Sequence, residues 1–187
     1  WVGWTAVTGL GMALGFLPAE PLAELLGLGI AQVIAPLIAG IWIGFLQWLL
    51  LRAYVTNIHD WIPNAGAGWM GGYALGLLTI KTLAGGFWEA VFGYIVFGVV
   101  VSLVQWPPLR REIPNLPAWV LANVLGWTAA LVIGQLLGGL YLQMNVQPEV
   151  TAALISGISG LTAGANTGAA LIWIVRQPER TYPEAVA

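Results

Sequence analysis

The residues best suited to chemistry in this chain recur at one fixed interval. The motif QW-x2-LR ends an apolar run at residues 47–52 and ends another at residues 105–110, 58 positions later. An indole ring favours the headgroup layer of a membrane, and an Arg four residues further on shares its helix face and can stack on it. The motif therefore predicts a membrane-edge anchor, with a binding role for the Gln, Trp and Arg group as the alternative. The predicted interface anchors are Gln47, Trp48, Arg52, Trp61, Gln105, Trp106, Arg110 and Trp119.

Ionisable residues are few and stand at the ends of the apolar runs. Lys81 and Glu89 flank the turn "LAGG" and are expected to clasp a hairpin, the alternative being a proton or ion relay. His59, the only histidine, stands beside Asp60 in a loop, and two such ligands are too few for a metal site. We expect a solvated loop histidine; an axial ligand to a chlorophyll-type pigment is the alternative.

Amides inside the apolar runs are the remaining candidates for a site. Gln32, Asn123, Gln135 and Asn166 are predicted to link neighbouring helices by hydrogen bonds. Pro36 follows Gln32 by four positions and can kink its helix. Broken helices with amides near the midplane also bind small substrates in transporters. A water-accessible cavity lined by the four amides would favour transport.

Motifs for catalysis are missing from the sequence. It contains no GxSxG, HExxH or P-loop pattern, and it has no cysteine, which excludes thiol chemistry and disulfides. We predict no catalytic residue, no metal site and no enzyme activity.

The composition indicates a membrane protein. Hydrophobic residues make up 59% of the 187 positions and charged residues 7%, against about a quarter in soluble domains. Apolar runs of about 20 residues, the length that crosses a bilayer, follow one another closely. A net charge of −2 with six Lys and Arg argues against nucleic acid as a partner.

A tandem repeat organises these runs. A shift of 58 aligns Gly40 with Gly98, and it aligns the segment around Trp61 with that around Trp119. We expect an all-α membrane domain over 1–176 with two-helix repeat units at about 29–83 and 86–141, partial units at 1–16 and 149–176, and a cytoplasmic tail at 177–187. The first partial unit is aligned by matching "GWTAVTGLG" (3–11) to "GWTAALVIG" (126–134). The expected spans are about 1–16, 29–52, 65–83, 86–106, 117–141 and 149–176.

Basic residues predict the orientation of these spans. We call the expected spans 29–52, 86–106 and 149–176 the QW-type helices, although Leu171 and Ile172 replace Gln and Trp in the last of them. Five arginines follow these helices, and Lys81 is the one basic residue on the opposite side. Because basic residues favour the cytoplasmic face, the arginine ends are expected to be cytoplasmic. The five are Arg52, Arg110, Arg111, Arg176 and Arg180.

Glycines spaced by four predict how the helices pack. Such stripes let backbones approach closely, within the chain or between subunits. A flat binding surface for a pigment or lipid is the alternative. The glycines predicted to pack helices are Gly40, Gly44, Gly68, Gly72, Gly76, Gly134, Gly160, Gly164 and Gly168.

The pattern GxxxG-x2-QW-x2-LR followed by W-x6-GW resembles multi-pass membrane proteins of phototrophic bacteria that carry this hairpin in tandem and have no assigned activity. The resemblance covers about 40–134 and weakens in the last span, where Leu171 and Ile172 replace Gln and Trp. It implies a bacterial inner membrane or photosynthetic membrane and no catalytic residues. The sequence leaves the cofactor unknown, and a lipid, a carotenoid and a chlorophyll-type pigment are the candidates.

Three functions remain open on these grounds. The first is a non-catalytic accessory or scaffold subunit of a larger membrane complex, photosynthetic in a phototroph, whose partners are lipids and other integral membrane subunits. The second is a transporter or channel for a small, weakly polar solute. The third is an anchoring module of a longer polypeptide, expected because the chain begins at Trp1 within an apolar run.

Overall fold

The computed structural model describes residues 1–55, 58–83, 85–110, 115–141 and 148–176. Every regular element in these ranges is a helix, which confirms the all-α class. Arg111, Arg180 and the expected tail at 177–187 lie outside the described residues. The helices are α1 (Val2–Phe16), α2 (Ala19–Leu26), α3 (Leu28–Leu51), α4 (Trp61–Thr82), α5 (Phe87–Leu109), α6 (Leu116–Tyr141) and α7 (Pro148–Val175).

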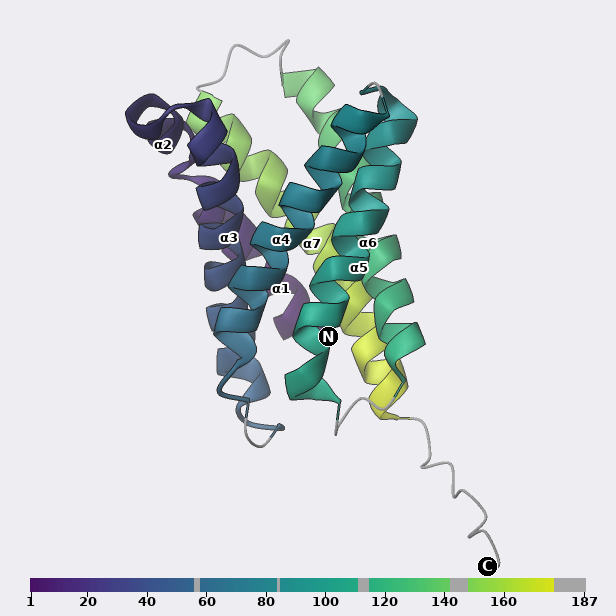
Figure 1. The fold of residues 1–187 in the computed structure, drawn as a ribbon. Helices are drawn as coiled ribbons and strands as arrows, with labels where there is room; N and C mark the ends of the chain where they lie inside the picture. Colours follow the sequence, from purple (N-terminus) through teal and green to yellow (C-terminus); the bar gives the residue numbers. More distant parts are fainter. Residues whose placement is uncertain (56–57, 84, 111–114, 142–147, 177–187) are drawn as a thin grey trace, which may run out of the picture.

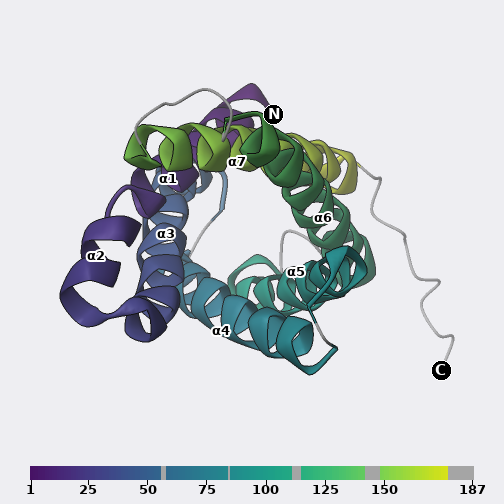
Figure 2. The same ribbon diagram turned by 90° about the horizontal axis from the view of Figure 1, so that it is seen from above.

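Six long helices form a closed ring. Seen from above, their order is α1, α3, α4, α5, α6 and α7, and α7 packs back against α1 (Figure 2). The short helix α2 lies outside the ring against α3. The first and last helices of the chain are therefore direct neighbours.

Within the described residues, four stretches are long and apolar enough to cross a membrane: Val2–Leu26, Leu28–Leu51, Phe87–Leu109 and Leu116–Gly139. The first of them runs through α1 and α2. Helices α4 and α7 are not among these four stretches. Both are long, but glycines and polar residues replace part of their apolar side chains.

The helix boundaries differ from the sequence prediction at three places. Helix α4 begins at Trp61 rather than 65, because Pro63 falls in the first turn, where backbone N–H groups have no acceptor within the helix. Helix α5 runs through Pro107 and Pro108 to Leu109, whose complete burial stabilises the last turn. Helix α2 was not predicted.

All three QW-type helices end at the same end of the bundle (Figure 1). Arg52 caps α3, Arg110 caps α5, and Arg176 follows α7. We call this end of the bundle the arginine end. The turn between α4 and α5, with Lys81 and Glu89 on its two sides, lies at the opposite end (Figure 1).

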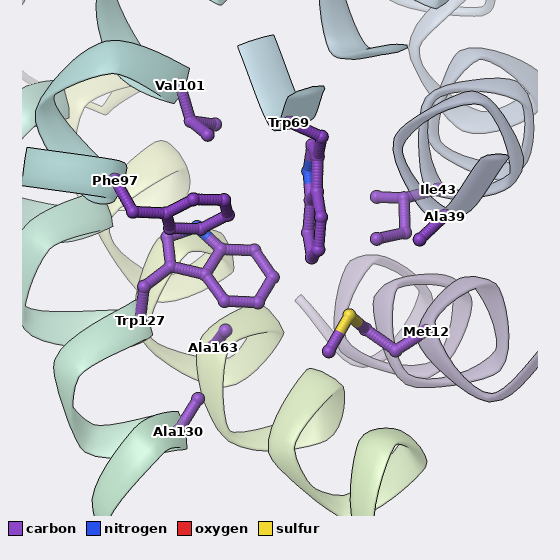
Figure 3. Close-up of a cluster of buried hydrophobic side chains, with 9 residues drawn as sticks. All are labelled: Met12, Ala39, Ile43, Trp69, Phe97, Val101, Trp127, Ala130 and Ala163. Carbon is purple, nitrogen blue, oxygen red and sulfur yellow. The ribbon is translucent and has the colours of Figure 1, made fainter. Parts of the chain in front are cut away.

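Two clusters of buried side chains lie inside the ring. The central cluster draws on all six ring helices (Figure 3) and consists of Met12, Ala39, Ile43, Trp69, Phe97, Val101, Trp127, Ala130 and Ala163. The arginine-end cluster consists of Trp4, Leu51, Ile58, Trp61, Leu109, Trp119 and Ile174.

The position of Trp4 corrects one sequence alignment. Matching 3–11 to 126–134 pairs Trp4 with Trp127, but Trp4 lies in the arginine-end cluster with Trp61 and Trp119. Met12 is the α1 residue that lies with Trp127. The shared Gly-Trp-Thr-Ala sequence therefore pairs two tryptophans that lie at different levels of the bundle. The level of a residue depends on its distance from the arginine end of its helix, and Trp4 is closer to that end than Trp127 is.

The nine glycines singled out in the sequence all face another helix of this same chain. A Cβ atom added to Gly40 would lie 2.6 Å from the Cβ of Trp69, and one added to Gly76 would lie 2.7 Å from the carbonyl oxygen of Gly93. On α7, Gly160 and Gly164 face Met12 and Thr8 of α1 in the same way. These glycines therefore pack helices of this chain against one another.

Candidate functional site

The first QW-x2-LR motif forms the contact between guanidinium and indole that its spacing predicts. The guanidinium carbon of Arg52 lies 5.1 Å from the centroid of the half-buried Trp48 ring. Phe45 stacks on the same indole, with the ring centroids 6.3 Å apart. In the second copy Trp106 is also half-buried and Arg110 exposed.

The anchor role expected for Trp61 and Trp119 does not fit their positions. Both indoles are buried, with exposures of 0% and 1%, inside the arginine-end cluster. Each residue lies near the start of its helix, where an interface residue would lie. Its side chain, however, points into the ring and not toward the outside. Neither indole Nε1 has a hydrogen-bond partner.

A chain of hydrogen bonds joins α3, α1 and α7 beside this cluster. Gln47 Nε2 donates to Thr8 Oγ1 at 3.0 Å, and Thr8 Oγ1 donates to the carbonyl of Trp4 at 2.8 Å. Trp4 Nε1 in turn donates to Thr167 Oγ1 at 3.0 Å. Gln47, which the sequence analysis lists as an interface anchor, is therefore buried and links α3 to α1. Gln105 is buried as well.

The four amides expected to line a transport cavity do not share one. Asn123 donates to the carbonyl of Trp119 and accepts from Trp127 Nε1, both on its own helix. Asn166 donates to the carbonyl of Thr162, one turn back. Of the four amides, only Gln135 lines the cavity described below. The four amides therefore do not form the water-accessible lining that would favour transport.

The ionisable candidates lie at the surface. His59 and Asp60 are exposed beside the arginine end. Lys81 is exposed and Glu89 half-buried, and no ion pair joins these two described residues. Within the described ranges, no three His, Asp or Glu side chains gather into a group that could hold a metal.

A cavity that the sequence analysis missed lies on the axis of the ring. Its volume is about 340 Å³, at the lower end of the range for small-molecule pockets. Its walls come from α1, α4, α5, α6 and α7, between the middle of these helices and their ends opposite the arginine end. The lining residues include Trp69, Tyr73, Tyr94, Phe97, Trp127, Gln135, Ile155, Ser156 and Ser159.

Three aromatic rings of the central cluster line this cavity. Trp69 and Trp127 meet edge to face with ring centroids 4.8 Å apart, and Phe97 lies 5.1 Å from Trp69 and 5.5 Å from Trp127 (Figure 3). This is the geometry that aromatic quadrupoles favour. The W-x6-GW repeat contained both tryptophans, and Trp69 with Tyr73 has the i, i+4 spacing of one helix face. That spacing was the signal available in the sequence.

On the other side of these rings the arginine-end cluster closes the axis. Trp61, Trp119 and Leu109 are each at most 1% exposed there. The cavity is therefore a pocket with a closed inner end.

Comparison of the chain with protein families, with curated proteins and with solved structures finds no match.

Proposed function

We propose that this chain is an integral membrane protein that crosses the bilayer six times and acts by binding, as a non-catalytic accessory subunit of a larger membrane complex. The observation that carries the proposal is the distribution of polarity. Large apolar side chains are exposed around the ring, among them Leu78 (57%), Leu103 (50%) and Leu121 (58%). Soluble monomers rarely expose extended apolar surface of this kind, whereas lipid requires it.

Among the described residues, seven polar side chains lie in the interior, where a bilayer would require them, whereas Gln135 and Asn166 are exposed. Most of the seven are hydrogen-bonded to a neighbouring helix or to the backbone one turn away. Desolvated polar groups need such partners. The buried polar residues are Thr8, Gln47, Ser102, Gln105, Asn123, Ser159 and Thr167.

If the ring lies in a bilayer, all six of its long helices cross it, including the two that are not among the four apolar stretches. Helix α4 leads from the arginine end of α3 to the opposite end, where α5 begins, so it crosses whenever α3 and α5 do. Helix α7 runs beside α1 and α6 in the same way. Glycine in α4 and α7 lowers their hydropathy, but these glycines lie against other helices and not against lipid.

Glycine contacts support the proposed repeat. Gly40 faces Ala65, and 58 residues later Gly98 faces Asn123. On α7, Gly164 faces Thr8 of α1. We therefore propose three two-helix units, α3–α4, α5–α6 and α7–α1, the third made from the two ends of the chain. With two crossings per unit, the copies have the same orientation and are related by an axis along the membrane normal.

Single cysteines test the embedding and its direction, because the chain has none of its own. Tyr54→Cys places a thiol at the arginine end, at a position 84% exposed, and Leu83→Cys places one at the other end. In intact cells a membrane-impermeant maleimide should label Leu83→Cys, and it should label Tyr54→Cys only after lysis. Equal labelling of both in intact cells would contradict the orientation.

The accessory role has a separate test. Gentle extraction with a mild detergent should recover the chain together with larger integral membrane subunits, identified by mass spectrometry. A protein that purifies as a stable monomer from its native membrane and retains no partner would argue against this role. The photosynthetic setting implied by the resemblance remains a prediction, and the identity of the partners decides it.

A further inference from the structure

We propose that the arginine end of α3 carries a binding site for one anionic phospholipid, whose phosphate lies in a hollow beside Arg52 and whose acyl chain lies along the outer face of α3. This inference rests on the proposed embedding of the ring and goes beyond it, because a bilayer alone does not select one lipid. Three features carry it: the hollow, the charge of Arg52, and a strip of aromatic rings that leads from Arg52 along the helix.

The hollow lies at the connection between α3 and α4 and combines an apolar part with a polar one. Its volume is about 440 Å³, within the range of small-molecule sites. The apolar part comes from Val55 and the buried Ile58, which belong to or pack against the arginine-end cluster. The polar part comes from the exposed residues Arg52, Tyr54 and His59. A phospholipid has the same combination where its phosphate joins the glycerol and the acyl chains.

The charge in this hollow favours an anion. The Arg52 guanidinium has five N–H donors and binds phosphate oxygens in a planar, bidentate geometry. The end of α3 carries a partial negative charge of about half a unit, which the full charge of Arg52 outweighs. Among the described residues, no acidic side chain forms an ion pair with Arg52. Asp60 is the only acidic residue described at this end, and it does not line the hollow.

A zwitterionic headgroup gains less here than an anionic one. Its choline or ethanolamine cation would need a carboxylate, and no Asp or Glu is among the residues that line the hollow. Aromatic faces also attract such cations. The Trp48 ring, however, already contacts the Arg52 guanidinium, 5.1 Å from the ring centroid, and that charge repels a second cation.

A strip of aromatic side chains leads from Arg52 along one face of α3. This α3 strip consists of Trp42, Phe45 and Trp48, with ring centroids 6.4 Å and 6.3 Å apart along it. Trp42 is 41% and Phe45 39% exposed, so a ligand can reach both rings. Trp42 stands ten residues before Arg52, which is about 15 Å along a helix and half of a hydrocarbon core of about 30 Å. The strip therefore matches the depth of one leaflet.

The second copy of the motif, on α5, has the charge without the strip. After the shift of 58 residues, Val100 and Leu103 stand where the α3 strip has its first two rings. Arg110 takes the place of Arg52 and is exposed at the same end. Large, rigid rings offer an acyl chain more contact area than aliphatic side chains and lose less rotamer freedom on contact. Arg110 is therefore the matched control for Arg52.

Two phospholipids with the same acyl chains test the proposal on the purified, delipidated protein in detergent micelles. Dioleoyl-phosphatidylglycerol carries a net negative charge, and dioleoyl-phosphatidylcholine is zwitterionic. Native mass spectrometry during a titration counts the lipids bound to each protein molecule. The first phosphatidylglycerol should bind about fivefold more tightly than the first phosphatidylcholine, the ratio that about 1 kcal/mol per basic residue produces.

Variants of the two arginines locate the charge. Arg52→Gln should abolish the preference for phosphatidylglycerol, whereas Arg110→Gln, with the same loss of charge, should leave it unchanged. Arg52→Lys retains the charge and should retain most of the preference. Because Arg52 is exposed, circular dichroism should show the same helix content in all three variants.

Variants of the strip locate the acyl chain. Phe45→Ala removes the middle ring, and it should weaken the binding of both lipids several-fold without changing their ratio. Leu103→Ala, at the equivalent position of α5, should change neither affinity. Glycerol 3-phosphate, which has the phosphate without acyl chains, should not displace phosphatidylglycerol at millimolar concentration.

Four outcomes would overturn the proposal. They are equal affinity for the two lipids, an equal loss of preference in Arg52→Gln and Arg110→Gln, unchanged affinities in Phe45→Ala, and displacement by glycerol 3-phosphate. The second denotes a general attraction of anions to the arginine end, and the last denotes a site for a soluble phosphate. Cysteine labelling tests the embedding separately, and the titration requires neither a partner subunit nor an orientation, so either proposal can fail while the other stands.

Discussion

Single buried side chains decide which helices of this ring are linked by polar contacts. The hydroxyl of Thr8 accepts from Gln47 and donates to the carbonyl of Trp4, so it connects α3 with α1. The Nε1 of Trp4 then reaches Thr167 on α7. By contrast, the Nε1 atoms of Trp61 and Trp119 have no partner. Two substitutions follow from this difference.

Removing the Thr8 hydroxyl should destabilise the ring. Thr8→Val keeps the side-chain shape but leaves the amide of Gln47 without its acceptor. We expect a loss of about 0.6–1.7 kcal/mol in the free energy of unfolding, the range of interhelical hydrogen bonds in membranes. Circular dichroism during SDS titration of mixed micelles measures it. Thr8→Ser keeps the hydroxyl and should cost much less; equal losses would mean that the hydrogen bond is not the cause.

Supplying an acceptor to Trp119 should stabilise the ring. In the proposed repeat Val101 occupies on α5 the position of Thr167, and Trp119 occupies that of Trp4. Val101→Thr is nearly isosteric and should raise the free energy of unfolding by about 0.5–1 kcal/mol by pairing the indole N–H. The same titration measures it. In a Trp119→Phe background the gain should vanish, and a gain that persists there would refute the assignment.

At the scale of the elements, glycine determines how closely helices approach. Helices α4 and α5 form a hairpin in which Gly76 and Gly93 face one another, backbone against backbone. On the same helix Gly71 has more space, because the nearest atom to an added Cβ is Val100 Cγ1 at 3.8 Å. The two glycines therefore form a matched pair.

Adding one methyl group should distinguish these two positions. In Gly76→Ala the new Cβ would lie 2.7 Å from the carbonyl oxygen of Gly93, and the helices must separate. We expect a loss of about 1–3 kcal/mol, as for other overpacked sites. Gly71→Ala should be neutral or slightly stabilising, because alanine restricts the unfolded chain. Both are measured by SDS titration, and equal effects would contradict the close approach.

At the scale of the whole molecule, the ring depends on contact between its two chain ends. Helix α7 lies against α1 along most of its length, with Gly157, Gly160, Gly164 and Gly168 facing it. Without this contact the remaining helices would form an open arc, and the axial cavity would lose the wall that α1 and α7 provide.

A disulfide should trap this closure. A Cβ added to Gly157 would lie 3.4 Å from the Cβ of Ala13, close to the separation in disulfides. Ala13→Cys combined with Gly157→Cys should lose both free thiols to mild oxidation, measured by maleimide labelling in SDS. Gly138→Cys with Ala13→Cys is the control, since nothing lies within 4 Å of a Cβ at Gly138, and its thiols should stay free. Persistent thiols in the first pair would contradict the ring.

The sequence by itself determined the helical class, most helix boundaries to within a few residues, and the clustering of Arg52, Arg110 and Arg176 at one end. These features follow from local apolar runs, prolines and charges. The nine glycines singled out by their spacing all face another helix, but the spacing alone does not select them, because Gly138 stands four residues after Gly134 and has nothing within 4 Å of an added Cβ.

Only the tertiary structure decided which side of each helix faces the axis. On α5, Val101 is buried and Leu103 exposed, although both are apolar. A helix that is apolar all round carries no 3.6-residue polarity pattern from which inside and outside can be told. For that reason the burial of Trp61 and Trp119, the cavity beside Trp69 and the contact of α7 with α1 depend on packing between helices distant in the chain.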